Sequence, residues 1–214
     1  MAIVFPSSPT VGQVFTSGSR SWIWTGSTWD SPSAVTAALS GLTMIVNQTI
    51  TNSAGYAVDN VFTSLYDNYR VVLKVDSMSA SNVVGINMSY RKAGATITAA
   101  NYRYGSYYIS IDGGGAGIFT RSNGAGPMYL GAAGVPSTPS VFSIDVFSPN
   151  IATTTTQYTM QAMTHYNGTA PSNSSNVPMW GSGSYTANDN LDGLIITPSA
   201  GNFSGNIKIY GYRN

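Results

Sequence analysis

Apolar and polar side chains alternate along most of this chain, from about residue 49 to residue 212. Residues 141–147 (VFSIDVF) are one example, in which Phe142, Ile144 and Val146 share a face. A repeat of two places successive side chains on opposite faces of an extended strand, so one face can be buried while the other is solvated. Clusters of Gly, Asn, Ser and Pro separate the runs, as turns do. The pattern therefore predicts an all-β fold.

Nine runs have the length and residue types of strands. They are Thr49–Asn52, Asn68–Ser77, Asn82–Lys92, Tyr102–Ile111, Pro127–Gly131, Ser140–Phe147, Gln157–Tyr166, Asn190–Pro198 and Gly205–Tyr212. Eight or nine such strands are enough for an antiparallel β-sandwich of two sheets. At 214 residues, the chain is long enough to bury the core of such a sandwich.

Charged side chains contribute little to the surface of this protein. Charged residues make up 8% of it, there is no Glu, and the net charge is +1, whereas about 25% charged residues is typical. Solvation falls instead to 29 Ser, 22 Thr and 17 Asn, which favour strands and turns over helices. The Lys and Arg residues are scattered, so the basic stripe of a nucleic-acid-binding protein is missing. Weak charge repulsion also favours self-association.

Several common elements are absent from the sequence. It contains no Cys, which excludes disulfides and thiolate metal sites. It begins without the cationic region and apolar run of a signal peptide, and no apolar run approaches the length of a membrane span. We therefore expect assembly in the cytoplasm without secretion, and no membrane insertion.

Three of the four Trp residues lie within eight positions near the amino terminus. Trp22, Trp24 and Trp29 occur among Gly, Pro, Ser and Thr, and residues 13–16 and 21–25 alternate around a Ser-Gly-Ser-Arg turn. This pattern predicts a small hairpin with one aromatic face. Such a segment has no core of its own, and a lone hairpin is only marginally stable. We therefore expect its rings to pack on the rest of the chain, on a second copy or on another protein.

Residues 33–48 form the one plausible helix in the sequence, with apolar residues at helical spacing until Gly41 interrupts them. A linker fits this segment nearly as well. We expect two parts in the chain: an attachment segment with its linker in residues 1–45, and a β-sandwich domain in residues 46–214.

Two sets of residues resemble parts of tailed-bacteriophage virion proteins. The first resembles their attachment segment and consists of Phe5, Pro6, Pro9, Phe15, Trp22, Trp24 and Trp29. The second, residues 65–73 and 205–214, resembles the opening and closing strands of domains in phage fibre, appendage and capsid-decorating proteins. The resemblance implies a jelly-roll-like antiparallel β-sandwich that assembles as a homotrimer. It also implies that the amino-terminal segment fastens the protein to a capsid, neck or tail protein of the virion.

The sequence contains no recognisable catalytic motif. His165 is the only histidine, so a Ser/His/Asp triad would have to centre on it, and nothing resembles a nucleophile elbow. A glycosidase carboxylate pair has little support among eight Asp and no Glu. Asp189 and Asp192 place oxygen ligands at alternate positions, but the bidentate Glu of a calcium loop is missing, and a turn is the simpler interpretation. We expect a non-enzymatic protein without a metal or cofactor.

Aromatic residues also cluster outside the first thirty residues. Exposed Tyr and Trp are typical of sugar-binding and subunit-packing surfaces, because the ring is apolar and its hydroxyl or N–H is polar. Tyrosines in a strand can also line the interior of a sandwich or a trimer axis. The candidate glycan or subunit contacts are Tyr102, Tyr104, Tyr107, Tyr108 and, in the loop-rich region 167–189, Trp180.

Taken together, these features predict a non-enzymatic virion structural protein that decorates or projects from a capsid or tail. The short chain favours a capsid decoration or a short fibre, because long tail fibres usually carry repetitive shaft sequence. The alternative is a tail-fibre receptor-binding module that recognises host surface carbohydrate.

Overall fold

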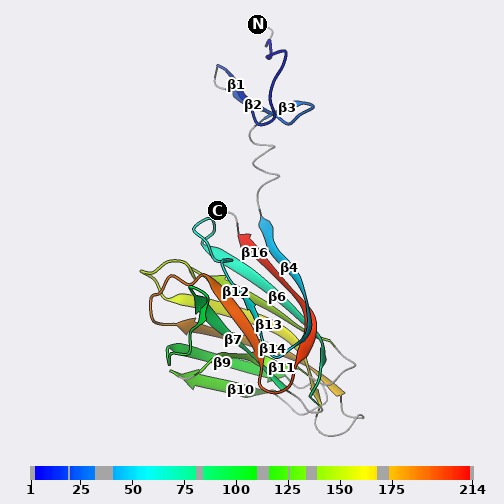
Figure 1. Ribbon diagram of the computed structural model, residues 1–214, viewed down its shortest axis with the longest axis vertical. Coiled ribbons are helices and arrows are strands. Elements are labelled where there is room, and N and C mark those ends of the chain that lie inside the picture. Colours follow the sequence, from blue (N-terminus) through cyan, green and yellow to red (C-terminus); the bar gives the residue numbers. More distant parts are fainter. Residues whose placement is uncertain are drawn as a thin grey trace. The chain divides into compact units, whose positions relative to one another are not determined.

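A computed structural model describes most of the chain, namely residues 3–18, 20–31, 41–80, 84–109, 116–124, 126–133, 139–167 and 174–212. Every regular element within these residues is a β-strand, which confirms the predicted all-β fold (Figure 1). The chain divides into two compact units. One extends from the amino terminus to Thr43, and the other is Met44–Tyr212.

The amino-terminal unit is a small antiparallel sheet of three strands, in the order β1 (Val14–Ser17), β2 (Arg20–Trp24) and β3 (Trp29–Asp30). The predicted hairpin is confirmed, with Phe15 directly opposite Trp22. The third strand follows a tight turn in which the N–H of Thr25 donates to the Thr28 carbonyl at 2.9 Å. Gly26 has a φ of 105° in this turn, a conformation that residues with a Cβ rarely adopt.

Two sheets form the β-sandwich of the larger unit. In spatial order, the larger sheet contains β10 (Ala116–Asn123), β9 (Tyr102–Ile109), β14 (Ser174–Tyr185), β13 (Thr156–Asn167), β12 (Ser140–Phe147), β6 (Asn68–Met78), β16 (Phe203–Tyr212) and β4 (Leu42–Ser53). The smaller sheet contains β11 (Met128–Ala133), β7 (Val84–Lys92), β15 (Gly193–Pro198) and β5 (Tyr56–Val58), and β8 (Ala95–Thr96) pairs with β7.

Eight of the described strands pair in a nested order. β4 pairs with β16 and β6 with β12 in the larger sheet, while β5 pairs with β15 and β7 with β11 in the smaller one. The first of these eight strands therefore pairs with the last, the second with the second last, and so on inward. A long antiparallel ribbon that folds over on itself into two sheets produces this order.

Two inserted hairpins enlarge one of the sheets. β9 and β10 lie between β7 and β11 in the sequence, whereas β13 and β14 lie between β12 and β15. β13 pairs with β12 and β14 pairs with β9, so the two hairpins join into a continuous four-stranded extension of the larger sheet.

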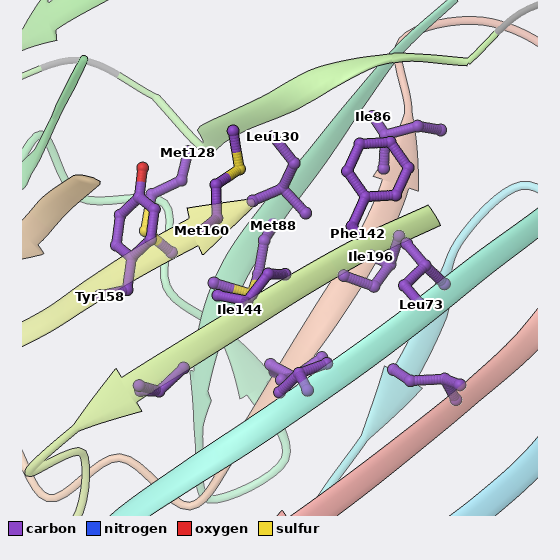
Figure 2. Packing of buried hydrophobic residues seen from close by; sticks show 14 of the residues in the cluster. Leu73, Ile86, Met88, Met128, Leu130, Phe142, Ile144, Tyr158, Met160 and Ile196 are labelled. Atoms are coloured by element: carbon purple, nitrogen blue, oxygen red, sulfur yellow. The ribbon is translucent and has the colours of Figure 1, made fainter. Parts of the chain in front are cut away.

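The core lies between the two sheets (Figure 2). Phe142 and Ile144 of β12 and their neighbour Leu73 of β6 are fully buried with residues of the smaller sheet such as Met88 and Ile196. Each fully buried side chain of this size contributes about 1.5–3 kcal/mol relative to an exposed one. The alternation seen in residues 141–147 thus marks which side of β12 faces the core.

All nine predicted strands are present, with shifts at their ends. The helix predicted for residues 33–48 is wrong in its second half, because residues 42–48 belong to β4; residues 32–40 lie outside the described residues. Helical spacing there competed with the β-branched residues Thr43, Ile45 and Val46, which favour a strand that pairs with β16.

The strand β14 was missed because its sequence looks like a loop. It is rich in Ser and Gly and contains Pro178, which lies just before the first residue that pairs with β9. A Cβ at Gly183 would lie 2.5 Å from the ring of Tyr158 and would also meet the Arg103 carbonyl. Close packing therefore requires glycine at this position of the strand.

Candidate functional site

Five aromatic rings form a cluster in the amino-terminal unit. Phe15 and Trp22 are cross-strand neighbours, as are Trp24 and Trp29. Phe5 joins them: its ring stacks on Trp29 at a centroid distance of 5.3 Å and contacts Phe15 at 5.1 Å and Trp22 at 5.4 Å. Aromatic pairs of this kind contribute about 0.5–1.5 kcal/mol beyond the burial of their area.

This aromatic cluster corrects one prediction. The segment was expected to lack a core of its own, whereas its rings pack on one another and form a small one. The five rings are nevertheless only half-buried, as are Pro6 and Pro9 in the irregular segment before β1. The unit is therefore pre-formed and still presents aromatic surface.

Sequence reasoning overlooked a second apolar feature of this unit. Four aliphatic side chains are largely exposed: Ile3 (44%), Val4 (80%), Val11 (76%) and Val14 (59%). Together they leave apolar area of this short segment in contact with water. Single Val and Ile residues among Pro, Ser and Thr form no periodic pattern, so only their exposure identifies them.

The four candidate tyrosines of β9 do not share a surface. Tyr102 is fully buried, so it is not a surface contact, and Tyr104 and Tyr108 are half-buried against the core. Only Tyr107 points to the outer face, where it is 46% exposed. The sequence left open that these tyrosines line the interior of the sandwich, and this interpretation applies to Tyr102, Tyr104 and Tyr108.

Tyr107 meets Trp180, the fifth candidate. Trp180 lies in β14 rather than in a loop, directly opposite Tyr107. Their rings stack with centroids 5.3 Å apart and planes 21° from parallel. The structure therefore brings together two of the five predicted contact residues.

A groove of about 310 Å³ adjoins this ring pair on the outer face of the larger sheet. We call it the outer-face groove; it is lined by Arg70, Ser143, Asp145, Thr159, Met160, Gln161, Trp180 and Gly181. Four adjacent strands, β6, β12, β13 and β14, supply these residues. Trp180, Gln161 and Ser143 are consecutive cross-strand partners. Thr159, Asp145 and Arg70 form the next row.

An ion pair forms the end of the groove farthest from Trp180. Arg70 donates from Nε and Nη2 to the two carboxylate oxygens of Asp145, each at 2.8 Å, and Tyr212 donates to Asp145 Oδ1 at 2.5 Å. Partial burial opposes ionisation of Asp145, but the hydrogen bonds from Arg70 and Tyr212 outweigh it and lower its pKa. Burial, together with the nearby Asp145 carboxylate, raises the pKa of Tyr212 to about 12. The pair is thus ionised and mutually compensated at neutral pH.

The carboxylates considered as calcium ligands have partners within the chain. Asp189 accepts hydrogen bonds from Lys92 Nζ and Tyr185 Oη, both at 2.7 Å, and Asp192 accepts one from the N–H of Ala93 at 2.6 Å. The hydrogen bond from Lys92, with that from Tyr185, lowers the pKa of Asp189. No group of three or more His, Cys, Asp or Glu suited to a metal occurs within the described ranges. The side chain of His165 lies outside the described residues.

The part of the chain described by the structure contains no helix that could span a membrane. Comparisons with protein families, with curated proteins and with solved structures found no match to this chain.

Proposed function

We propose that this protein is a non-enzymatic structural protein of a bacteriophage virion, attached to another virion protein through its amino-terminal unit. The observation that carries the proposal is the character of that unit. It is compact in itself, it is held by a ring cluster centred on Phe5, and it exposes four aliphatic side chains. Burial of these side chains against a partner would remove their apolar area from water.

The geometry supports a specific mode of attachment. Interfaces draw most of their binding energy from a few aromatic and aliphatic anchors that become desolvated. Here the ring cluster fixes the backbone, so Val4, Val11 and Val14 are presented without a large ordering cost. Burial of these side chains, together with the exposed parts of Trp22 and Trp24, would provide the contact.

The strand order supports a jelly roll for the sandwich. Jelly rolls are two-sheet folds in which a long antiparallel ribbon is wound over on itself. The nested pairs β4/β16, β5/β15, β6/β12 and β7/β11 have that order. This is also the fold that the resemblance to phage fibre and capsid-decorating proteins implies.

The edge strand β4 supports self-association, for which the resemblance to virion proteins implies a homotrimer. Natural edge strands usually carry Lys, Pro or a bulge that discourages pairing with another chain. β4 is twelve residues long, contains neither a charged residue nor Pro, and exposes Leu42 (44%), Met44 (55%) and Ile45 (36%). A neighbouring copy would cover this apolar edge.

Deletion of residues 1–30 tests the attachment. The truncated protein should keep the β-sandwich, measured by circular dichroism and thermal unfolding, and should no longer cosediment with particles that lack the wild-type protein. The variant Trp180→Ala, altered far from the deleted segment in sequence, should still cosediment. Cosedimentation of the truncated protein at the wild-type level would refute the attachment role.

The number of copies per particle would distinguish a location on the capsid shell from one on a tail or neck. We favour a capsid decoration or short fibre over a tail fibre, because the chain has no repetitive shaft sequence. Hundreds of copies per virion would support decoration of the shell, whereas about a dozen would place the protein on a tail or neck.

A second candidate function is recognition of host surface carbohydrate. The specific observation in its favour is the exposed Tyr107–Trp180 stack beside a groove with polar walls. The two functions are compatible, because attachment depends on the amino-terminal unit and recognition on the sandwich.

A further inference from the structure

We infer that the outer-face groove binds a short, neutral oligosaccharide that runs across the strands from Trp180 toward Arg70. The inference deepens the second candidate function and rests on it, but it is independent of attachment through the amino-terminal unit. Four properties of the groove carry the inference: its aromatic wall, its unpaired polar floor, its charge balance and its length.

The aromatic wall is an exposed stack that the core does not explain. Large rings are normally buried, yet Tyr107 is 46% exposed and Trp180 only half-buried, both on the face opposite the core. Each ring restrains the other at 5.3 Å. A pyranose presents an apolar face of C–H groups, and a fixed indole or phenol ring is a suitable platform for it.

The polar floor has hydrogen-bonding capacity to spare. Gln161, next to Trp180, and Thr159 are exposed, and Ser143 follows on the next strand. Among the described residues, none of these three side chains has a hydrogen-bonding partner. An amide and two hydroxyls can each both donate and accept, which matches the hydroxyl groups of a sugar.

The charges in the groove favour a neutral ligand. A free Arg would attract the carboxylate of an acidic sugar. Two nitrogens of Arg70 are instead committed to Asp145, whose negative charge compensates the guanidinium. An anionic ligand would have to displace or approach that carboxylate, so acidic sugars should bind less well than neutral ones.

The dimensions favour an oligosaccharide over a single sugar. Trp180 and Arg70 are three strands apart in the sheet, which corresponds to about 14 Å at the usual interstrand spacing of about 4.8 Å. The volume of about 310 Å³ is at the lower end for small-molecule sites, which are usually lined mainly by apolar side chains. A polar groove of this length suits an extended, hydroxylated ligand.

The test uses the indole N–H resonances of the full-length protein, which contains four Trp residues. Trp180→Phe identifies the Trp180 peak, and neutral cello-, malto- and manno-oligosaccharides are then titrated into the wild type, with oligouronates as the acidic comparison. We expect at least one neutral series to shift the Trp180 peak selectively. Trp180→Ala and Gln161→Ala should each weaken that binding by about tenfold or more, as loss of an anchor does.

Two control variants make the result specific. Phe147→Ala removes another exposed ring of the same face, outside the groove, and should leave the affinity unchanged. Trp24→Ala alters the amino-terminal unit and should also leave it unchanged. If the wild type binds an oligosaccharide while the protein that lacks residues 1–30 still cosediments with particles, the attachment role is refuted and the inference about the groove is supported.

Three outcomes would overturn the inference. The first is that no neutral oligosaccharide shifts the Trp180 peak. The second is that binding survives Trp180→Ala undiminished, which would place the ligand elsewhere. The third is that Trp180→Ala lowers the molecular mass in solution, which would make the Tyr107–Trp180 stack a contact between subunits.

Discussion

Tyr212 reaches across a strand to Asp145. Its hydroxyl donates to the carboxylate at 2.5 Å, although β6 lies between β16 and β12 in the sheet. The same carboxylate accepts two hydrogen bonds from Arg70 of the intervening strand, whose guanidinium carbon Cζ lies over the Tyr212 ring, 5.7 Å from its centroid. Three neighbouring strands are therefore joined on their outer face by one acidic residue.

Removal of the Tyr212 hydroxyl should weaken this connection. A hydrogen bond to a charged group contributes about 1.5–3 kcal/mol when buried, and partial exposure of Asp145 lowers this to about 1 kcal/mol. Tyr212→Phe should lose that amount in urea unfolding. Tyr210→Phe is the matched control: it lies two residues earlier on the same face, has no hydrogen-bonding partner among the described residues, and should be neutral.

Alkaline pH should destabilise the sandwich. Burial raises the pKa of Tyr102 to about 12, and burial also raises the pKa of Tyr90 and Tyr158. Because these pKa values exceed the value of about 10 for an unfolded chain, their stabilising contribution is complete below about pH 10 and declines as the pH rises toward 12. Urea midpoints measured from pH 8 upward, with tyrosinate absorbance recorded in parallel, should fall in that window. A flat midpoint through pH 12 would contradict the burial of these rings.

The amino-terminal ring cluster should depend on Phe5. Phe5 contacts three other rings of the unit, so Phe5→Ala should move the indole N–H peaks of Trp22, Trp24 and Trp29 toward the position of an unfolded chain and leave the Trp180 peak in place. Val4→Ala is the control, because Val4 is 80% exposed and should not alter the cluster. Unchanged peaks in Phe5→Ala would show that the cluster does not hold the unit together.

Close packing around Gly183 of β14 leaves no room for a side chain. The ring of Tyr158 and the carbonyl of Arg103 occupy the space that a Cβ would need, so Gly183→Ala should cost about 1–3 kcal/mol of the free energy of unfolding. Gly105, in the adjacent strand β9, has nothing within 4 Å of its Cβ position. Gly105→Ala should therefore cost far less, and equal losses in the two variants would contradict close packing around Gly183.

Self-association should depend on the edge of β4. A Lys at Ile45 would place a charge on an apolar edge that we propose to be covered by a second copy, as natural edge strands do to prevent pairing. Light scattering should then report the mass of a monomer for Ile45→Lys in place of that of a trimer. Val141→Lys, which adds the same charge at an exposed position on the outer face, should keep the trimer.

Alternation allowed most of the fold to be predicted, since strands such as β12 and β16 bury one side and solvate the other. The prediction failed at Gly183, where close packing requires a residue type that is common in loops. It also failed near Ile45, where apolar residues at helical spacing include β-branched residues that favour a strand. The candidate site could be predicted only in part from the sequence, because Tyr107 and Trp180 are far apart in the chain and meet only through the pairing of β9 with β14. No local pattern marks Arg70 or Asp145 as neighbours of that pair.

The outer-face groove lies where the nested eight-stranded framework meets the four-stranded extension of the larger sheet. Arg70 and Asp145 belong to the nested eight-stranded framework, whereas Gln161 and Trp180 belong to an inserted hairpin. Replacement of that hairpin would change the part of the proposed ligand groove that contains Gln161 and Trp180, and it would leave the framework strands unchanged. The ligand preference that we propose for the groove could therefore be altered through this one hairpin.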